Sequence, residues 1–589
     1  MNQKKIEEKL IKAYHDYNKK SHFKSEFDIR SVINRFIAEN KIETLSTELK
    51  AERMAFNFTH NLLCENEDWQ TYYGPIFIGT NDAGEQVEYP SIKAITQDII
   101  SYWKKRANEE TINLLKGRYA DLVWTFSRIV CVGSPEVDFP RIAIDAFIVL
   151  PNNDNGEEPI NVIALLGRAL SLSMSINDES RIEISKQAIL NYEQKVAIDD
   201  KPGLWGFVYQ LLIDNSKVNL TQIEESGIIN RIENRLTNLT NPDHASFSPW
   251  AAEISADFLA RYYRKKSMTT DMKRVLLAYS AAFEHQSLKG APLQVSVWLQ
   301  KVYAVLKSFG LEQEATEILK KIQTNAPKIS DDMQEIKVKA NISQEEFDHY
   351  INWFIEKDLD LALRRVVVNF IPKKEDVVKQ LLKMSEESPL YSIANVQIQD
   401  YKGRTLATLG NLQNDLEGNV AHQMTRDLGF ESAFLNQIFK AIENKFEFTV
   451  ENLLNYLYKV SIYTPERKDI IKSAIVEYFN KNYLQFIHLS IPQIEEIFKG
   501  LIEKCKGSVL IPNKHGGFHF KTLDALLRDP IIEKVFGEDV SLYFRVVLTD
   551  PRGLNIRNDV CHGLMPLENF NAVIANRLLH ILLCLSSVK

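Results

Sequence analysis

Arg557 and His562 lie within six residues of each other, in the string Arg557-Asn558-Asp559-Val560-Cys561-His562. A guanidinium is a planar, permanently charged group that fits the oxygens of a phosphate. An imidazole can accept or donate a proton near neutral pH. On a helix, Asn558 and His562 share a face because they are four positions apart, and the long Arg557 side chain can reach round to it. These residue types could carry out acid–base chemistry on a phosphodiester, and no cluster of metal ligands lies near them in the sequence.

The neighbours of this string predict how it is held. Gly563 is expected to end a short helix, which leaves His562 in the last turn. The carboxy terminus of a helix favours a protonated imidazole. Glu495 and Glu496 are expected near the start of an earlier helix, where their charge suits the helix dipole. One of them, Glu495, is a candidate to hold Arg557 in place.

The same residues also have a purely structural interpretation. A cluster of Arg, Asn and Asp before a glycine can cap helices and tie loops together. Asp559 is expected to pair with an arginine rather than to act as a base, and Asn555 is a further supporting candidate. Cys561 is expected to be packed and inert on the apolar side of the helix. From the residues alone, the structural and the catalytic interpretations both stay open.

The flanks of the string extend it to a longer pattern, Gly553-Leu554-Asn555-Ile556-Arg557-Asn558 before and His562-Gly563-Leu564 after. This pattern resembles the R-x4-H signature of the HEPN superfamily. It is similar to a largely bacterial group in which a long helical region precedes a carboxy-terminal HEPN domain. The close resemblance covers residues 485–589, and a looser likeness extends to the RYADLVW run at 118–124.

The resemblance implies an all-α HEPN domain with endoribonuclease activity. In such a site His562 would move the proton during attack of the RNA 2′-hydroxyl, Arg557 would stabilise the developing charge, and Asn558 would orient one of them. It also implies a homodimer with the two sites apposed, since the chain has one copy of the motif. A toxin or phage-defence role with a trigger or inhibitor protein is a further implication. The alternative is a non-catalytic HEPN scaffold that binds partners or nucleotides.

The elements that must position the site are expected to be helices. Apolar residues at three- and four-residue spacing predict a helix that starts near Ser490–Pro492 and a final helix over Leu567–Leu585. Between them lie a glycine loop with two histidines, at 513–520, and two shorter helical stretches, at 523–527 and 541–548. Residues 485–589 are therefore expected to form a helical bundle with the polar string at one junction.

The rest of the chain is also predicted to be helical. Helical hairpins are expected at 138–193, at 249–286 and at 291–322, as an irregular solenoid or bundle without a strict repeat. A small β-hairpin is expected near 72–89, and residues 325–332 are the expected linker. We predict four domains: 1–137, with the hairpin; 138–330, a scaffold of helical hairpins; 331–484; and 485–589, the HEPN-like domain.

Composition restricts the class of protein. The chain has 589 residues, 45% of them hydrophobic, and no apolar run of the roughly 20 residues needed to span a bilayer. Five scattered cysteines without a CxxC pair fit a reducing compartment, so we expect a cytoplasmic protein. We also expect no membrane contact and no cofactor. The net charge is −7, and residues 485–589 carry 12 Lys and Arg against 11 Asp and Glu. RNA contact would therefore have to be local.

Weaker signals lie outside the motif. Arg261, Tyr262, Arg264 and Lys265 interleave aromatic and basic residues, which suits either a charged helix end or an RNA contact. His515 and His519 have a spacing seen in metal sites, but no third ligand lies near them in the sequence. No nucleotide-binding glycine loop, zincin or hydrolase motif is present.

Overall fold

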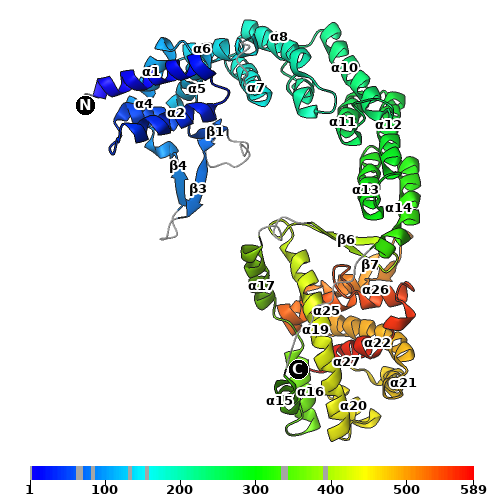
Figure 1. Ribbon diagram of the computed structural model, residues 1–589. Coiled ribbons are helices and arrows are strands. Elements are labelled where there is room, and N and C mark those ends of the chain that lie inside the picture. Colours follow the sequence, from blue (N-terminus) through cyan, green and yellow to red (C-terminus); the bar gives the residue numbers. More distant parts are fainter. Residues whose placement is uncertain are drawn as a thin grey trace. The chain divides into compact units, whose positions relative to one another are not determined.

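The computed structural model describes residues 3–60, 71–80, 86–130, 136–152, 158–332, 343–388 and 395–588. Most of these residues are helical, which confirms the predicted all-α class (Figure 1). They divide into two compact units: Met1–Ala291 with Trp298–Thr316, and Pro292–Val297 with Glu317–Lys589. The four-domain division stays a prediction. None of the helices in the described ranges is long and apolar enough to span a bilayer.

The first unit is built from consecutive helices. Their bounds are α1 (Gln3–Ser21), α2 (Glu26–Glu39), α3 (Thr47–Ala55), α4 (Gln97–Glu109), α5 (Asn113–Val130), α6 (Asp138–Phe147), α7 (Pro159–Ser175), α8 (Glu179–Val196), α9 (Gly206–Val208), α10 (Gln222–Thr240), α11 (Pro249–Lys265) and α12 (Thr269–Ser287). Helices α13 (Pro292–Ser308) and α14 (Glu312–Asp332) each contribute residues to both units. Gly310 lies between them with φ of 80°, as expected for a glycine that ends a helix. The predicted helical hairpins at 138–193 and 249–286 are confirmed, because α6, α7 and α8 pack in succession and α11 packs on α12; the two helices predicted in 291–322 are present as α13 and α14.

Four two-stranded antiparallel sheets accompany the helices in the described part of the chain. Strands β3 (Phe77–Thr80) and β4 (Gln86–Tyr89) form the predicted hairpin; its turn, at 81–85, lies outside the described residues. Three pairings were not predicted: β1 (Phe58–His60) with β2 (Tyr73–Pro75), β5 (Val396–Gln399) with β6 (Thr405–Leu409), and β7 (Leu510–Pro512) with β8 (Phe518–Phe520).

The RYADLVW run lies in α5 and supplies buried polar groups to the first unit. Arg118, 2% exposed, donates from Nε to the carbonyl oxygen of Ala55 at 2.8 Å. Asp121, fully buried, accepts two hydrogen bonds from Arg168, at 2.6 and 2.8 Å. Buried charges are tolerated when paired in this way. These contacts give the run a structural role.

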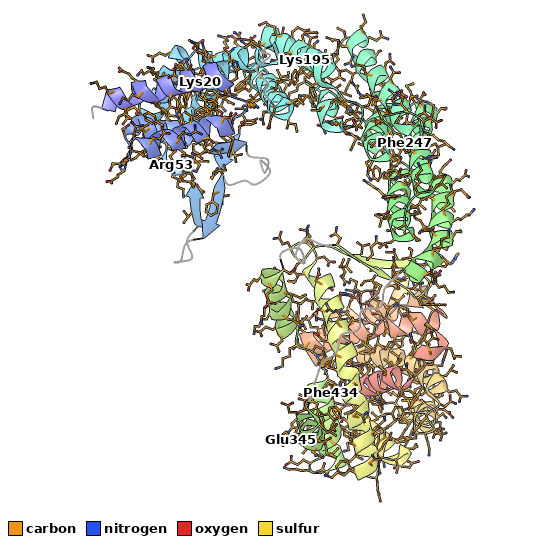
Figure 2. All side chains as sticks on the ribbon, in the orientation of Figure 1. Lys20, Arg53, Lys195, Phe247, Glu345 and Phe434 are labelled. Atoms are coloured by element: carbon orange, nitrogen blue, oxygen red, sulfur yellow. The ribbon has the colours of Figure 1, made fainter. Side chains whose placement is uncertain are left out.

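The second unit contains the polar string. Its helices are α15 (Gln344–Phe354), α16 (Leu359–Asn369), α17 (Lys374–Glu387), α19 (Leu416–Lys445), α20 (Val450–Leu457), α21 (Lys468–Phe479), α22 (Tyr483–Lys504), α23 (Leu523–Leu527), α24 (Pro530–Phe536), α25 (Glu538–Leu548), α26 (Ile556–Cys561) and α27 (Ala572–Leu585). One continuous hydrophobic core joins residues from Phe354 to Leu585. Residues 485–589 therefore share their core with the helices that precede them. At one side of it, Phe434 of α19 packs against Phe347 and Tyr350 of α15. Figure 2 labels Phe434 and, at the start of α15, Glu345.

Three predicted boundaries are wrong. Residues 325–332 are not a linker but the last turns of α14, because Ala326 and Ile329 are each only 1% exposed and hold the segment in the fold. Helix α22 does not start at Ser490–Pro492 but runs through Pro492 from Tyr483, because burial of its apolar face offsets the proline's cost of about 3 kcal/mol. The final helix starts at Ala572 because Asn571 caps the backbone N–H groups of Val573 and Ile574.

A buried histidine in this core predicts a pH-dependent stability. His580 is fully buried, and its Nε2 lies 3.1 Å from the carbonyl oxygen of Val366, which can only accept a hydrogen bond. Nε2 therefore carries the proton, and Nδ1 accepts from the Tyr543 hydroxyl at 2.7 Å. Burial, with a smaller contribution from the nearby Arg577 charge, lowers the pKa of His580 to about 3.

Because the pKa of His580 is lowered in the folded state, the unfolded chain takes up the proton first as the pH falls below about 6.5. We expect this residue alone to lower the free energy of unfolding by about 2 kcal/mol between pH 7 and pH 5. Urea unfolding of the wild type and His580→Gln at both pH values measures the effect. The loss of unfolding free energy between pH 7 and pH 5 should be smaller in His580→Gln than in the wild type, and unchanged in the exposed control His488→Gln. An equal loss in all three proteins would refute the role of His580.

Candidate active site

The short helix α26 carries the polar string, and its conformation is set by the residues on either side. Asn555, the residue before the helix, adopts the left-handed conformation with φ of 50°, which asparagine tolerates better than most residues. Ile556 and Val560 lie on its buried face. Gly563 follows with φ of 66°, so it ends the helix as predicted, and His562 is the capping residue. Figure 1 shows α26 beside α25, which it contacts.

Arg557 is held from two sides. Its Nη2 donates to Oε2 of Glu495 on α22 at 3.2 Å, and its Nη1 donates to Oδ1 of Asn558 at 3.1 Å. The guanidinium is thereby fixed while its side chain stays 22% exposed. Its Nε is buried without a hydrogen-bond partner among the described residues, an arrangement that costs free energy and is rare in folded proteins. The contact between Glu495 and Arg557 that the sequence suggested is therefore present.

Asn558 links the helix to the loop before it. Its Nδ2 donates to Oδ1 of Asn555 at 2.8 Å and to the carbonyl oxygen of Thr549 at 3.1 Å. Both donors of the amide are therefore used, which leaves its oxygen facing Arg557. Asn558 is expected to orient either Arg557 or His562, and the side chain that it contacts is that of Arg557.

Asp559 has a different partner from the one predicted. Its Oδ1 accepts a hydrogen bond from Nδ2 of Asn555 at 3.1 Å, and no arginine pairs with it in the described part of the chain. The expected arginine pair is therefore wrong: the left-handed turn at Asn555 brings the amide, and not a guanidinium, to the carboxylate. Burial raises the pKa of Asp559, and the hydrogen bond from Asn555 opposes that shift.

His562 is exposed, and its ring makes no hydrogen bond or ion pair with the residues that the structure describes. An exposed imidazole ring is accessible to a substrate and can serve it as a general acid or base. Arg557 and His562 thus differ, although the first lies in α26 and the second caps the same helix. The arginine is held rigidly by a carboxylate and an amide, whereas the histidine is available.

Two other expectations around the helix are wrong. Cys561 is exposed and not packed, because the buried side of α26 is taken by Ile556 and Val560. Glu495 does not lie near a helix start, because α22 begins at Tyr483 and places it mid-helix. Glu495 and Glu496 therefore do not interact with the dipole at a helix start. The contacts of Glu495 are instead with Arg557 and Lys499.

The Arg261 cluster lies in the last turns of α11, in the first unit. Arg261 pairs with Asp257 at 2.9 Å and with Asp214 at 3.0 Å, so its charge is balanced. Arg264 lies over the ring of Phe309. The cavity next to them, of about 560 Å³, is lined by Arg261, Tyr262, Arg264 and Lys265, among others. The alternatives of a charged helix end and an RNA contact both remain, with the internal pairing of Arg261 favouring the first.

His515 and His519 lie in the β7–β8 hairpin and are both exposed. Asn513 forms the turn: its Oδ1 accepts from the backbone N–H groups of His515 at 2.8 Å and Gly517 at 3.2 Å. Within the described ranges, no group of three or more His, Cys, Asp and Glu residues is arranged to hold a metal ion. The predicted glycine loop is thus an ordered hairpin.

Lys499 and Phe520 are the neighbours of the site that the sequence did not single out. Lys499 pairs with Glu495 at 3.2 Å, and its Nζ lies 4.9 Å from the centroid of the Phe520 ring. The spacing of four between Glu495 and Lys499 was a usable signal for the ion pair. Phe520 could not be placed without the strand pairing of β7 and β8.

Comparison with known proteins adds no relative. The chain matches no protein-family model, no curated protein and no solved structure. The likeness to the HEPN superfamily therefore stays a prediction that rests on Arg557, Asn558, His562 and their flanks. The function has to be argued from the geometry of these residues.

Proposed function

We propose that the chain is a metal-independent endoribonuclease whose site is built on Arg557 and His562. The observation that carries the proposal is the division of roles on α26. Arg557 is fixed by Glu495 and Asn558, and His562 has an exposed ring with no partner among the described residues. A fixed cation and an exposed imidazole in one short segment suit phosphodiester chemistry, in which one group stabilises charge and the other moves a proton.

The proposed reaction uses the substrate's own 2′-hydroxyl as the nucleophile. His562 accepts the hydroxyl proton as the 2′ oxygen attacks the adjacent phosphorus. The bond from phosphorus to the 5′ oxygen breaks, and that oxygen receives a proton. The products are a 2′,3′-cyclic phosphate and a 5′-hydroxyl. DNA cannot react in this way because it lacks the 2′-hydroxyl.

The proposal includes a homodimer in the cytosol. Two copies of His562 would supply both roles, one accepting the 2′ proton and the other donating to the 5′ oxygen, and two copies of Arg557 would add positive charge. A trigger or inhibitor protein, and a toxin or phage-defence role, belong to the same proposal and rest on the HEPN likeness.

A non-catalytic scaffold is the second candidate. The ion pair between Arg557 and Glu495 favours it, because that pair joins α26 to α22 as a purely structural contact would. A scaffold has no use for the free His562 ring, however. The two candidates therefore differ in what they require of His562.

The first test is incubation of the purified chain with total RNA and with a tRNA pool in EDTA, beside DNA of matched length. The proposal predicts that RNA is cut and DNA is not, because cleavage needs the 2′-hydroxyl and no metal. In parallel, induced expression is expected to slow growth of the host, and His562→Ala is expected to relieve it. If RNA stays intact and expression is equally harmless for the wild type and His562→Ala, the scaffold is correct.

A further inference from the structure

The β7–β8 hairpin stands out because its apolar residues are exposed. Phe518 is 68% exposed, Phe520 57% and Leu510 42%. In the strand register, Leu510 is opposite Phe520, and Pro512 is opposite Phe518. Since side chains alternate along a strand, Phe518 and Phe520 lie on the same face of β8. Neither strand contributes a residue to the buried core.

The segment around the hairpin is basic in an otherwise acidic chain. Residues 499–521 contain five lysines and one glutamate, against a net charge of −7 for the whole chain. Lys506 and Lys514 are exposed and form no ion pair within the described ranges. Exposed aromatic rings together with unpaired lysines are the combination that holds single-stranded nucleic acid, by stacking bases and binding phosphates.

The hairpin is connected to the candidate active site by a chain of contacts. The Phe520 ring lies against Lys499, Lys499 pairs with Glu495, and Glu495 pairs with Arg557. The hairpin is therefore linked to Arg557 through the side chains of Lys499 and Glu495. The contact with Lys499 also anchors β8 to α22, while Val509, 3% exposed, anchors the base of the hairpin in the core.

We infer that the β7–β8 hairpin binds single-stranded RNA, with bases stacked on Phe518 and Phe520 and phosphates held by Lys506 and Lys514. The inference rests on the proposed function, because it gives the nuclease its substrate class: unpaired RNA. Stacking needs rings that are free of a partner base, so duplex RNA would bind the hairpin poorly. The positive charge of residues 499–521 also explains how residues 485–589, which are near neutral in total, can hold a polyanion.

The test is binding of a fluorescein-labelled 12-nucleotide RNA to the full chain in a His562→Ala background, measured by fluorescence anisotropy. Replacing Phe518 and Phe520 together by alanine is expected to weaken binding at least about thirty-fold, from the usual contribution of stacking per base. Phe430→Ala is the matched control, since Phe430 is 56% exposed in the same unit, and it should leave binding unchanged. Removing Lys506 and Lys514 should lower the salt dependence of binding.

Leucine variants separate RNA stacking from protein docking. Phe518→Leu with Phe520→Leu keeps the apolar surface but removes the rings, so the inference predicts binding as weak as with alanine. Equal RNA binding by the alanine variant and the wild type would overturn it. A change in oligomeric state, measured by sedimentation, would also overturn the inference if the alanine variant shows it and the leucine variant does not. That result would make the hairpin a protein interface.

The same variants distinguish this inference from the proposed function. If the protein with native His562 cuts RNA and the alanine variant cuts equally well, the hairpin inference fails and the nuclease stands. If no RNA is cut but RNA binding still depends on Phe518 and Phe520, the nuclease fails and the hairpin inference stands as an RNA-binding site. An absence of RNA binding in every protein overturns the hairpin inference.

Discussion

His562→Ala and Arg557→Ala are each expected to lower the rate of RNA cleavage by about a thousand-fold. Removing a positioned acid–base group costs about 10² to 10⁴ in rate, and removing a group that stabilises developing charge costs a similar factor. The ring of His562 makes no hydrogen bond with the described residues, and its backbone bond to Asn558 is kept in alanine, so its replacement should leave stability unchanged. Single-turnover cleavage of a labelled RNA measures both rates.

Matched controls separate catalysis from folding in this experiment. His488 is an exposed histidine on α22, and His488→Ala should cut RNA at the wild-type rate. Arg557→Lys keeps the charge but loses the planar group that contacts both Glu495 and Asn558, so we expect a rate between those of the wild type and Arg557→Ala. Wild-type rates for His562→Ala, in protein whose unfolding curve is unchanged, would contradict the assignment.

Gly553→Ala is expected to lower the stability of the second unit by about 3 kcal/mol and to abolish cleavage. A Cβ on Gly553 would lie 2.2 Å from the carbonyl oxygen of Val546, far inside contact distance. That oxygen accepts from the N–H of Leu554 at 2.8 Å, so it fixes the loop that leads into α26. The backbone must move to admit the methyl group, and the motif moves with it.

Gly500→Ala is the control for this prediction. Gly500 lies within α22, and a Cβ there would meet nothing within 4 Å. Because alanine favours a helix over glycine, Gly500→Ala should leave stability unchanged or raise it by up to about 1 kcal/mol. Urea unfolding followed by circular dichroism compares the two variants. Equal stability of Gly553→Ala and the wild type would show that the close approach at Val546 is not required.

The helices of this chain could be predicted because apolar periodicity is a local property of sequence. Gly310 and Gly563 end helices where expected, since a positive φ is a local demand on one residue. The start of α22 could not be predicted from Pro492, because burial of the whole helix face outweighs the proline. Long-range packing decided that boundary, as it did the end of α14.

The candidate site was predictable in type and only partly in geometry. The pattern selected Arg557, Asn558 and His562, and spacing placed them on one short helix. The pair between Arg557 and Glu495 joins residues 62 apart, so it depends on how α26 packs on α22. The sequence predicts a loop at the β7–β8 hairpin because Asn513–Gly517 carries a strong turn signal, whereas the two strands, of three residues each, are too short to give a strand pattern.

The most direct test of the central claim is the chemistry of the ends left in EDTA on a defined single-stranded RNA. Mass spectrometry of the products should find a 2′,3′-cyclic phosphate on one fragment and a 5′-hydroxyl on the other. A single 2′-deoxynucleotide at the cut site should block that cut, and His562→Ala should yield no such fragments. Products with 5′-phosphate ends, or cleavage that survives the 2′-deoxy substitution, would contradict attack by the 2′-hydroxyl and with it the proposed site.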